Sequence, residues 1–229
     1  MVILGLEKVS LVDYEGYMCA TVFTGGCNFN CSFCHNAMLV REEVKPLDEA
    51  EVLEYLNKRK GLLEAVTISG GEPTLQHDLE DFIIKVKALG YKIKLDTNGT
   101  RPEVLKDLLD KGLLDFVAMD IKTCFNDYEK ITRAKNELVN KVQESLKILK
   151  ESSIEYELRT TLVKEFHNEE SILKMAKELK DEKILYLQKF VDSGACIENN
   201  LTEVEKSEAV KYKEILEKTI KKVVLRGYN

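Results

Sequence analysis

The chain has 229 residues, of which 44% are hydrophobic and 32% charged, and this is enough to bury the core of one large domain. Its net charge of -6 argues against general nucleic-acid binding, which needs a basic surface to displace counterions from phosphates. No apolar run reaches the roughly 18 to 20 residues that cross a bilayer, and no signal-peptide pattern is visible. We therefore expect a cytoplasmic protein that binds neither nucleic acid nor membrane.

Short β-branched runs alternate with segments whose apolar residues recur every three or four positions, which is typical of a parallel α/β protein. Strands are predicted at 19–24, 65–69, 91–96, 115–120, 155–163 and 184–190. Helices are predicted at 48–61, 77–90, 102–111, 136–150, 168–180 and 202–222, and a last strand at 222–227.

The unusual residues follow the ends of these strands. "GGEP" follows the second strand and "TNG" the third, while "MDIK", "RTT" and "LQKF" lie at the ends of the next three. In parallel sheets and barrels, sites are assembled at this edge. A complete eight-unit barrel takes about 250 residues, so six units suggest an incomplete (β/α)6 barrel. We predict a single α/β domain over 1–229, with its core at about 17–190 and a helix and strand extension at 191–229.

Three of the six cysteines, Cys27, Cys31 and Cys34, lie within eight residues with the spacing C-x3-C-x2-C. In a reducing compartment such a trio is more often a metal site than a disulfide framework. A [4Fe-4S] cluster normally takes four thiolates, so three would leave one iron open to a chelating ligand. A structural zinc site is the alternative, with His35 or a distant cysteine as the fourth ligand. His35 directly follows Cys34, so we expect its side chain to point away from the same metal and either to support the metal ligands or to serve in packing.

The other cysteines and histidines have no supporting constellation. Cys19, Cys124 and Cys196 are isolated and are expected to be buried as small hydrophobes. His77 and His167 are expected at the surface or in helix caps.

The triad, with Phe33 before its last cysteine, resembles the signature of radical S-adenosylmethionine (SAM) enzymes. The resemblance implies that the three cysteines hold a [4Fe-4S] cluster whose fourth iron is chelated by the amino and carboxylate groups of SAM. An electron from the cluster would cleave SAM to methionine and a 5'-deoxyadenosyl radical, which abstracts hydrogen from the substrate. Phe33, near adenine, and Asn36 are then cofactor-binding residues. Without the resemblance, Phe33 would be a core aromatic.

"SGGEP" resembles the family motif that holds the amino group of SAM, which assigns Gly70, Gly71 and Glu72 to the cofactor. Glycines allow close approach of the backbone, and a carboxylate beside an ammonium makes a charge-assisted hydrogen bond. Alone, "GGEP" could equally be an ordinary turn. Its position one βα unit after the triad favours the cofactor role.

"LDTNG" and "MDIK" resemble the next two cofactor-contacting edges. Asp96, Thr97 and Asn98 would face the ribose or the methionyl end of SAM, with Asp120 and Lys122 nearby and Lys122 suited to a carboxylate. The alternatives are a turn for "TNG" and a strand-end ion pair for "MDIK". The resemblance also suggests a monovalent cation site, formed by Asp96, Thr97, Met119 and Asp120.

Arg159 lies in "ELRTTLV" at the end of a predicted strand. It could hold the carboxylate or sulfonium region of SAM. It could also pair with Asp120 or Glu72, and the sequence favours neither interpretation.

Over nearly its whole length the chain resembles glycyl-radical-enzyme activases, above all the group of anaerobic ribonucleoside-triphosphate reductase activating proteins. "GGCNFNCSFCHN", "SGGEPTLQ", "KLDTNG" and "FVAMDIKT" carry this resemblance. The usual Pro-Gly after the "D-Y" pair is Glu15-Gly16 here, so the entry turn is expected to differ. The ferredoxin-type cysteine cluster of some activases does not occur between the triad and "GGEP", so a single cluster is expected.

The resemblance implies an oxidoreductase that removes hydrogen from a backbone glycine of a partner glycyl radical enzyme, such as anaerobic ribonucleotide reductase. It also implies an electron donor such as flavodoxin or ferredoxin. Two alternatives stay open at this point. One is a radical SAM enzyme that modifies a small molecule or peptide, and the other is a non-catalytic iron-sulfur or zinc module.

Overall fold

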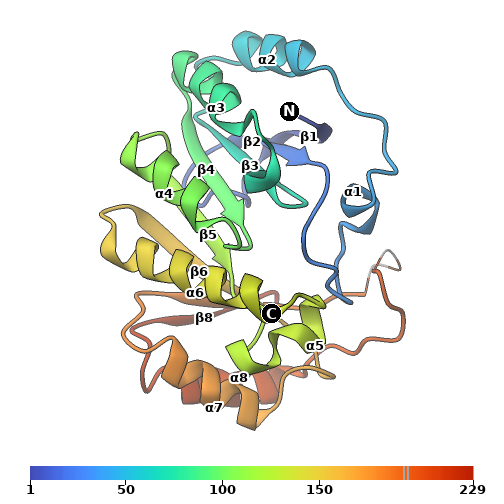
Figure 1. Cartoon of the computed structure of the whole chain (residues 1–229), viewed down its shortest axis with the longest axis vertical. Helices are drawn as coiled ribbons and strands as arrows, with labels where there is room; N and C mark the ends of the chain where they lie inside the picture. The colour runs from blue at the N-terminus through green and yellow to red at the C-terminus, as the bar shows by residue number, and fades with distance from the viewer. Residues whose placement is uncertain (193, 195, 229) are drawn as a thin grey trace. The chain divides into compact units, whose positions relative to one another are not determined.

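The computed structural model describes residues 1–192, 194 and 196–228 (Figure 1). Its strands are β1 (Ile3–Ser10), β2 (Cys19–Thr24), β3 (Ala65–Gly70), β4 (Lys92–Thr97), β5 (Phe116–Asp120), β6 (Glu155–Leu162), β7 (Leu185–Lys189) and β8 (Val223–Arg226). Its helices are α1 (Ala37–Val40), α2 (Glu49–Lys58), α3 (Leu79–Ala88), α4 (Pro102–Asp110), α5 (Tyr128–Thr132), α6 (Asn136–Glu151), α7 (Glu169–Glu178) and α8 (Lys206–Leu216), with the 3-10 segments η1 (Pro73–Leu75) and η2 (Phe125–Asp127).

The strands follow one another in the sheet in chain order, from β1 to β8. β1 pairs antiparallel with β2, whereas the pairs β2 with β3, β3 with β4, β6 with β7 and β7 with β8 are parallel. In the part of the chain that the structure describes, the order does not close from β8 back to β1. The predicted α/β class, with a mostly parallel and incomplete barrel sheet, is therefore confirmed.

The predicted strands correspond to β2 through β8, each with boundaries that differ by no more than one residue. The sequence analysis did not identify β1, the strand that pairs antiparallel with β2. The last predicted helix, at 202–222, is shorter in the structure, where α8 spans Lys206–Leu216.

Local sequence signals explain where the helices begin and end. The side chain of Asp48 accepts a hydrogen bond from the backbone of Ala50 at the start of α2, and Asn168 and Ser171 form a capping box at the start of α7. After α3, Gly90 has a φ of 95°, which lets the chain leave the helix in the left-handed region. No helix among the described residues is long and apolar enough to cross a membrane.

The chain forms two compact units. Unit 1 comprises Met1–Asn28, Met38–Ala118 and Lys141–Tyr156, and unit 2 comprises Phe29–Ala37, Met119–Asn140 and the chain from Glu157 onward. Apolar strand side chains are fully buried in both units, as at Val66 and Ile68 of β3 in unit 1 and at Leu185 and Leu187 of β7 in unit 2. The cysteine motif is divided, because Cys27 belongs to unit 1 while Cys31 and Cys34 belong to unit 2.

The connection from β1 to β2 contains a tight turn at the position where the family usually has Pro-Gly. The backbone N–H of Tyr17 donates to the carbonyl of Tyr14 at 3.0 Å, and Gly16 has a φ of 85°. A positive φ at the third residue is what a type II turn requires, and that turn tolerates Glu15 at its second residue. Tyr14 packs against Tyr17 and Phe116, with ring centroids 4.7 and 5.5 Å apart. The turn therefore forms without the proline.

Candidate functional site

Three glycines, Gly26, Gly70 and Gly71, lie where the loop after β2 contacts the end of β3 and the loop that follows it in unit 1. The backbone N–H of Gly71 donates to the carbonyl of Thr24 at 2.9 Å, and that of Glu72 donates to the carbonyl of Gly26 at 2.8 Å. A Cβ on Gly71 would lie 1.9 Å from the Gly26 oxygen, and Gly70 has a φ of 113°. Both positions therefore require glycine, and "SGG" serves to let two backbones touch.

The carboxylate of Glu72 is fully buried and links the loops after β3 and β4. One oxygen accepts from the backbone and hydroxyl of Thr74, at 3.1 and 2.5 Å, and from the hydroxyl of Thr97 at 2.7 Å. The other accepts from the backbone N–H of Asn98 at 2.6 Å. Burial raises the pKa of Glu72, and these hydrogen bonds act in the opposite direction.

Asn98 extends this network to the first cysteine. Its amide nitrogen donates to the side-chain oxygen of Asn28 at 3.0 Å and lies 3.8 Å from the sulfur of Cys27. Its oxygen accepts from the backbone and hydroxyl of Thr100, at 3.0 and 2.7 Å, and that hydroxyl accepts from Asn28 at 2.7 Å. The sequence analysis missed Asn28 and Thr100, because their contacts are made between loops that are far apart along the chain.

Asp96 lies at the end of β4 and is half-buried. The hydroxyl of Ser69 donates to one of its oxygens at 3.0 Å, and the ammonium of Lys94 lies 3.6 Å from the other. Lys94 is itself buried and donates to the backbone carbonyl of Asp13. Of the residues of the predicted cation site, Asp96 and Thr97 belong to unit 1, whereas Met119 and Asp120 belong to unit 2. The cation site stays a prediction.

In unit 2, the second half of the cysteine motif is attached to the end of α5. The backbone N–H groups of Asn30 and Ser32 donate to the carbonyls of Thr132 and Ile131, at 2.9 and 3.4 Å. The N–H of Cys34 donates to the carbonyl of Cys31 at 3.0 Å, which closes a turn between the two cysteines. Burial raises the pKa of the Cys31 thiol to about 11, against the opposing influence of Lys122.

Phe33 is buried in an apolar cluster of unit 2 that contains Val163 and Phe190. The ring of His35 contacts Phe190, with centroids 5.4 Å apart, which agrees with the packing role, one of the two roles expected for it. Asn36 lies half-buried just before α1. Phe33 thus has the burial expected of a core aromatic, and its contact with adenine stays a prediction.

Asp120, Lys122 and Arg159 form a charged triad at the ends of β5 and β6. One oxygen of Asp120 lies 2.9 Å from the Lys122 ammonium, and the other accepts from Nε of Arg159 at 2.9 Å. Burial alone would raise the pKa of Asp120, but the two cations hold it at about 2. Burial would likewise lower the pKa of Lys122, but Asp120 and the nearby thiols raise it well above its usual range. The pairing of Arg159 with Asp120 was one of its two predicted roles.

Two buried side chains hold the backbone of Lys122. The hydroxyl of Tyr128 accepts the Lys122 N–H at 3.0 Å. Nδ1 of His167 accepts the N–H of Val163 at 3.0 Å, and its Nε2 donates to the carbonyl of Lys122 at 2.9 Å. The expectation that His167 lies at the surface or in a cap was wrong, because its 2% exposure and these hydrogen bonds make it part of the interior. Burial lowers the pKa of His167, although its contacts with the backbone of Lys122 and Val163 oppose this.

The remaining cysteines differ in burial. Cys19 and Cys124 are fully buried, as predicted, whereas Cys196 is only half-buried. The Cys196 sulfur lies 3.8 Å from the carbonyl of Phe33 and 3.7 Å from Nδ1 of His35. None of the six cysteines forms a disulfide, and no group of three His, Cys, Asp or Glu side chains among the described residues is gathered as a preformed metal-ion site.

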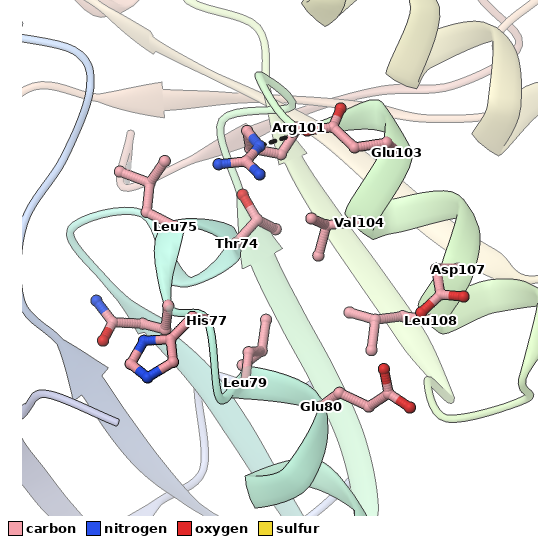
Figure 2. A pocket seen from close by; sticks show the side chains of 11 residues that line it. Thr74, Leu75, His77, Leu79, Glu80, Arg101, Glu103, Val104, Asp107 and Leu108 are labelled. Atoms are coloured by element: carbon pink, nitrogen blue, oxygen red, sulfur yellow. Dashed lines mark hydrogen bonds and ion pairs between the residues drawn. The ribbon is translucent and has the colours of Figure 1, made fainter.

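A cavity of about 460 Å³ lies in unit 1 between the η1 to α3 segment and α4. Figure 2 shows Thr74 and Arg101 at its upper end, where Arg101 pairs with Glu103. His77 lies on its rim with a 95% exposed side chain, as expected for this histidine. The predicted cofactor-binding residues do not line this cavity.

Comparison with known proteins places these features in a family. The family model of the Radical SAM superfamily matches residues 21–187. A candidate glycyl-radical enzyme activating enzyme of Methanocaldococcus jannaschii is 33% identical over 231 residues, which cover 98% of this chain and 95% of that protein. A candidate GTP 3',8-cyclase of Thermococcus kodakarensis is 32% identical over 113 residues, or 48% of this chain and 36% of that protein.

The fold is also found in solved structures. The structure of anSMEcpe with bound AdoMet and the Cp18Cys peptide has a TM-score of 0.64 at 17% identity. The match covers 86% of this chain and 57% of that chain.

Proposed function

The chain belongs to the radical SAM superfamily, and from this premise we propose that it is a glycyl-radical-enzyme activating enzyme. The observation that carries the proposal is the 33% identity, over 98% of the chain, to a protein with that name. The substrate would be a backbone glycine in a loop of a partner glycyl radical enzyme, such as anaerobic ribonucleotide reductase. A flavodoxin or ferredoxin would supply the electron.

Family membership supports a [4Fe-4S] cluster and SAM as the cofactors. When bound, they supply a one-electron reductive cleavage that yields the 5'-deoxyadenosyl radical. The donor set fits the cluster, because Cys27, Cys31 and Cys34 form no disulfide and thiolates are the ligands that iron-sulfur clusters take. Three thiolates leave one iron for SAM. We propose these cysteines as the ligands.

In unit 1, the chain's own residues would shape the loops that receive SAM. Gly70 and Gly71 let the loops after β2 and β3 touch, and the Glu72 carboxylate joins the second of these to Thr97 and Asn98. Glu72 already accepts four hydrogen bonds while fully buried. One oxygen accepts only the Asn98 N–H, but the side chain is fully buried, so a direct contact with the SAM ammonium would require the surrounding loops to move. We therefore assign Glu72 chiefly to positioning these loops.

In unit 2, Lys122 and Arg159 are cations held in place by the carboxylate between them. Asp120 orients both side chains, with contacts of 2.9 Å to each. Cations fixed in this way are suited to the carboxylate of SAM, since little side-chain entropy is lost when it binds. We propose Phe33, whose ring centroid lies 5.9 Å from the Lys122 ammonium, as the aromatic residue beside adenine.

The second candidate is a radical SAM enzyme that modifies a small molecule or peptide. It is favoured by the partial identity to a candidate GTP 3',8-cyclase and by the fold shared with anSMEcpe, whose structure contains a peptide. Both candidates use the same cofactors. They differ in which molecule loses the hydrogen atom, a glycine of a partner enzyme or a small molecule or peptide.

Electron paramagnetic resonance separates the two. The reconstituted protein would be mixed anaerobically with SAM, dithionite and each glycyl radical enzyme of its source organism. A radical doublet in one partner, absent when SAM or this protein is omitted, is the expected result. Absence of a doublet in every partner, with 5'-deoxyadenosine release stimulated by a metabolite or peptide instead, would favour the second candidate.

A further inference from the structure

Lys122 is a positive charge that unit 2 holds against the cysteine loop. Its ammonium lies 5.9 Å from the ring centroid of Phe33, which separates Cys31 from Cys34 in the sequence. Its side chain is only 17% exposed, so water screens it weakly. We propose that Lys122 raises the reduction potential of the cluster bound by this loop, before SAM is present.

The position of this charge relative to the loop is fixed by α5. The hydroxyl of Tyr128, in the first turn of α5, accepts the N–H of Lys122 at 3.0 Å. The last residues of the same helix, Ile131 and Thr132, accept the N–H groups of Ser32 and Asn30. One short helix thus holds both the lysine and the loop.

Further contacts restrict Lys122 from other sides. Its ammonium pairs with Asp120 at 2.9 Å, and its carbonyl accepts from His167 at 2.9 Å. Tyr128 also packs against Phe29 of the loop, with ring centroids 6.2 Å apart. A charge restrained in this way cannot swing into solvent, so its influence on the two thiolates is permanent.

The net charge of the triad gives the sign of the effect. Asp120, Lys122 and Arg159 together carry one positive charge, and without Lys122 the remaining pair is neutral. Reduction adds one electron to the cluster, and a positive charge nearby favours the more negative state. Net charge and solvent exposure are among the factors that set cluster potentials. Loss of Lys122 should therefore make the cluster harder to reduce.

The test is a dithionite redox titration of the reconstituted protein without SAM, followed by electron paramagnetic resonance. In Lys122→Met, the ratio of reduced to oxidised cluster at a fixed potential should fall at least about tenfold. For a one-electron couple, a tenfold fall corresponds to a decrease of about 59 mV in the reduction potential. In Asp120→Asn, the same ratio should rise, because a negative charge is lost. Lys130→Met, which removes a 73% exposed charge from α5, is the control and should change the ratio less than about twofold.

The outcomes are separated by measuring iron in each variant. If Lys122→Met and Asp120→Asn bind as much iron as the wild type and both ratios stay within about twofold of it, the proposal is overturned and Lys122 serves SAM alone. If Lys122→Met fails to bind iron, the decision falls to Lys122→Arg, which keeps the charge, and to Asp120→Asn. A wild-type ratio of reduced to oxidised cluster in Lys122→Arg, together with a raised ratio in Asp120→Asn, supports the proposal. An unchanged ratio in Asp120→Asn overturns it.

The proposal rests on the assignment of the cluster ligands but not on the glycine substrate. Wild-type protein without iron would refute that assignment, and a missing partner radical would refute only the proposed reaction.

Discussion

The carboxylate of Glu72 accepts the backbone N–H of Asn98 at 2.6 Å and so joins the loop after β3 to the loop after β4. Through its side chain, Asn98 then reaches Asn28 and the sulfur of Cys27. The "GGEP" motif, which contains no predicted metal ligand, is thereby connected to the first cysteine of the triad. In unit 1, Cys27, Asn28 and "GGEP" therefore belong to one hydrogen-bonded network.

Replacing Glu72 with Gln should weaken both folding and SAM binding. The Gln amide carries no charge, and its NH2 group would face the N–H and O–H groups that donate to Glu72, so hydrogen bonds would be lost. The free energy of unfolding should therefore fall by about 1 to 3 kcal/mol. SAM affinity, measured by anaerobic calorimetry, should fall as the loops loosen, while iron content is kept. Glu51→Gln, at an exposed position of α2, is the matched control. Unchanged stability and affinity in Glu72→Gln would refute the positioning role.

Replacing Gly71 with Ala should disrupt the contact between the loops. The added Cβ would lie 1.9 Å from the Gly26 oxygen, and both backbones are fixed by hydrogen bonds. We expect a loss of more than about 3 kcal/mol of unfolding free energy, seen in thermal denaturation. Gly5→Ala is the control, since its Cβ would meet only the side chain of Phe23, at 3.3 Å. Equal stability of the two variants would contradict this account of "SGG".

Local patterns predicted most of the fold. The β-branched runs of β2 through β8 and the helix caps are signals that act over a few residues, so their positions could be read directly. β1 was missed because Gly5 interrupts its alternation and its residues 7–9 are all exposed. α5 was missed because five residues are too few to show a helical period.

The site was predicted unevenly for the same reason. Cysteine spacing and "GGEP" are local patterns, and they identified Cys27 and Glu72. The residues around them act over long separations, as when His167 contacts Lys122 across 45 positions. A lone histidine carries no signal of such a contact. Only the burial seen in the structure shows that His167 is an interior residue that holds the backbone of Lys122.

Changing Cys27, Cys31 or Cys34 singly to Ala should abolish the cluster. Each supplies one of the three thiolates that a four-iron cluster needs beside SAM, so the wild type should bind about four irons after anaerobic reconstitution and the variants far fewer. Cys19→Ala, Cys124→Ala and Cys196→Ala are the controls and should keep their iron. Iron and sulfide analysis makes the measurement. Stoichiometric zinc without iron in the wild type would revive the zinc interpretation.

The stability of the protein should depend on pH through His167. Burial lowers its pKa, so as the pH falls below about 6.5 the unfolded chain gains a proton that the folded chain does not bind. Unfolding free energy should therefore fall with decreasing pH in this range, and His167→Gln should reduce that dependence. His77→Gln, at a 95% exposed side chain, should leave it unchanged. Denaturant titrations at several values from about pH 8 to about pH 5 would test this. The same change of unfolding free energy with pH in the wild type and both variants would contradict it.

The most direct test of the proposed reaction follows the hydrogen atom itself. The partner enzyme would be prepared with glycine deuterated at its α carbon and incubated anaerobically with this protein, SAM and dithionite. Mass spectrometry of the released 5'-deoxyadenosine should then show one added deuterium, together with a glycyl radical in the partner. Continued SAM cleavage without deuterium transfer from any glycyl radical enzyme of the organism would contradict the proposal that a backbone glycine is the substrate.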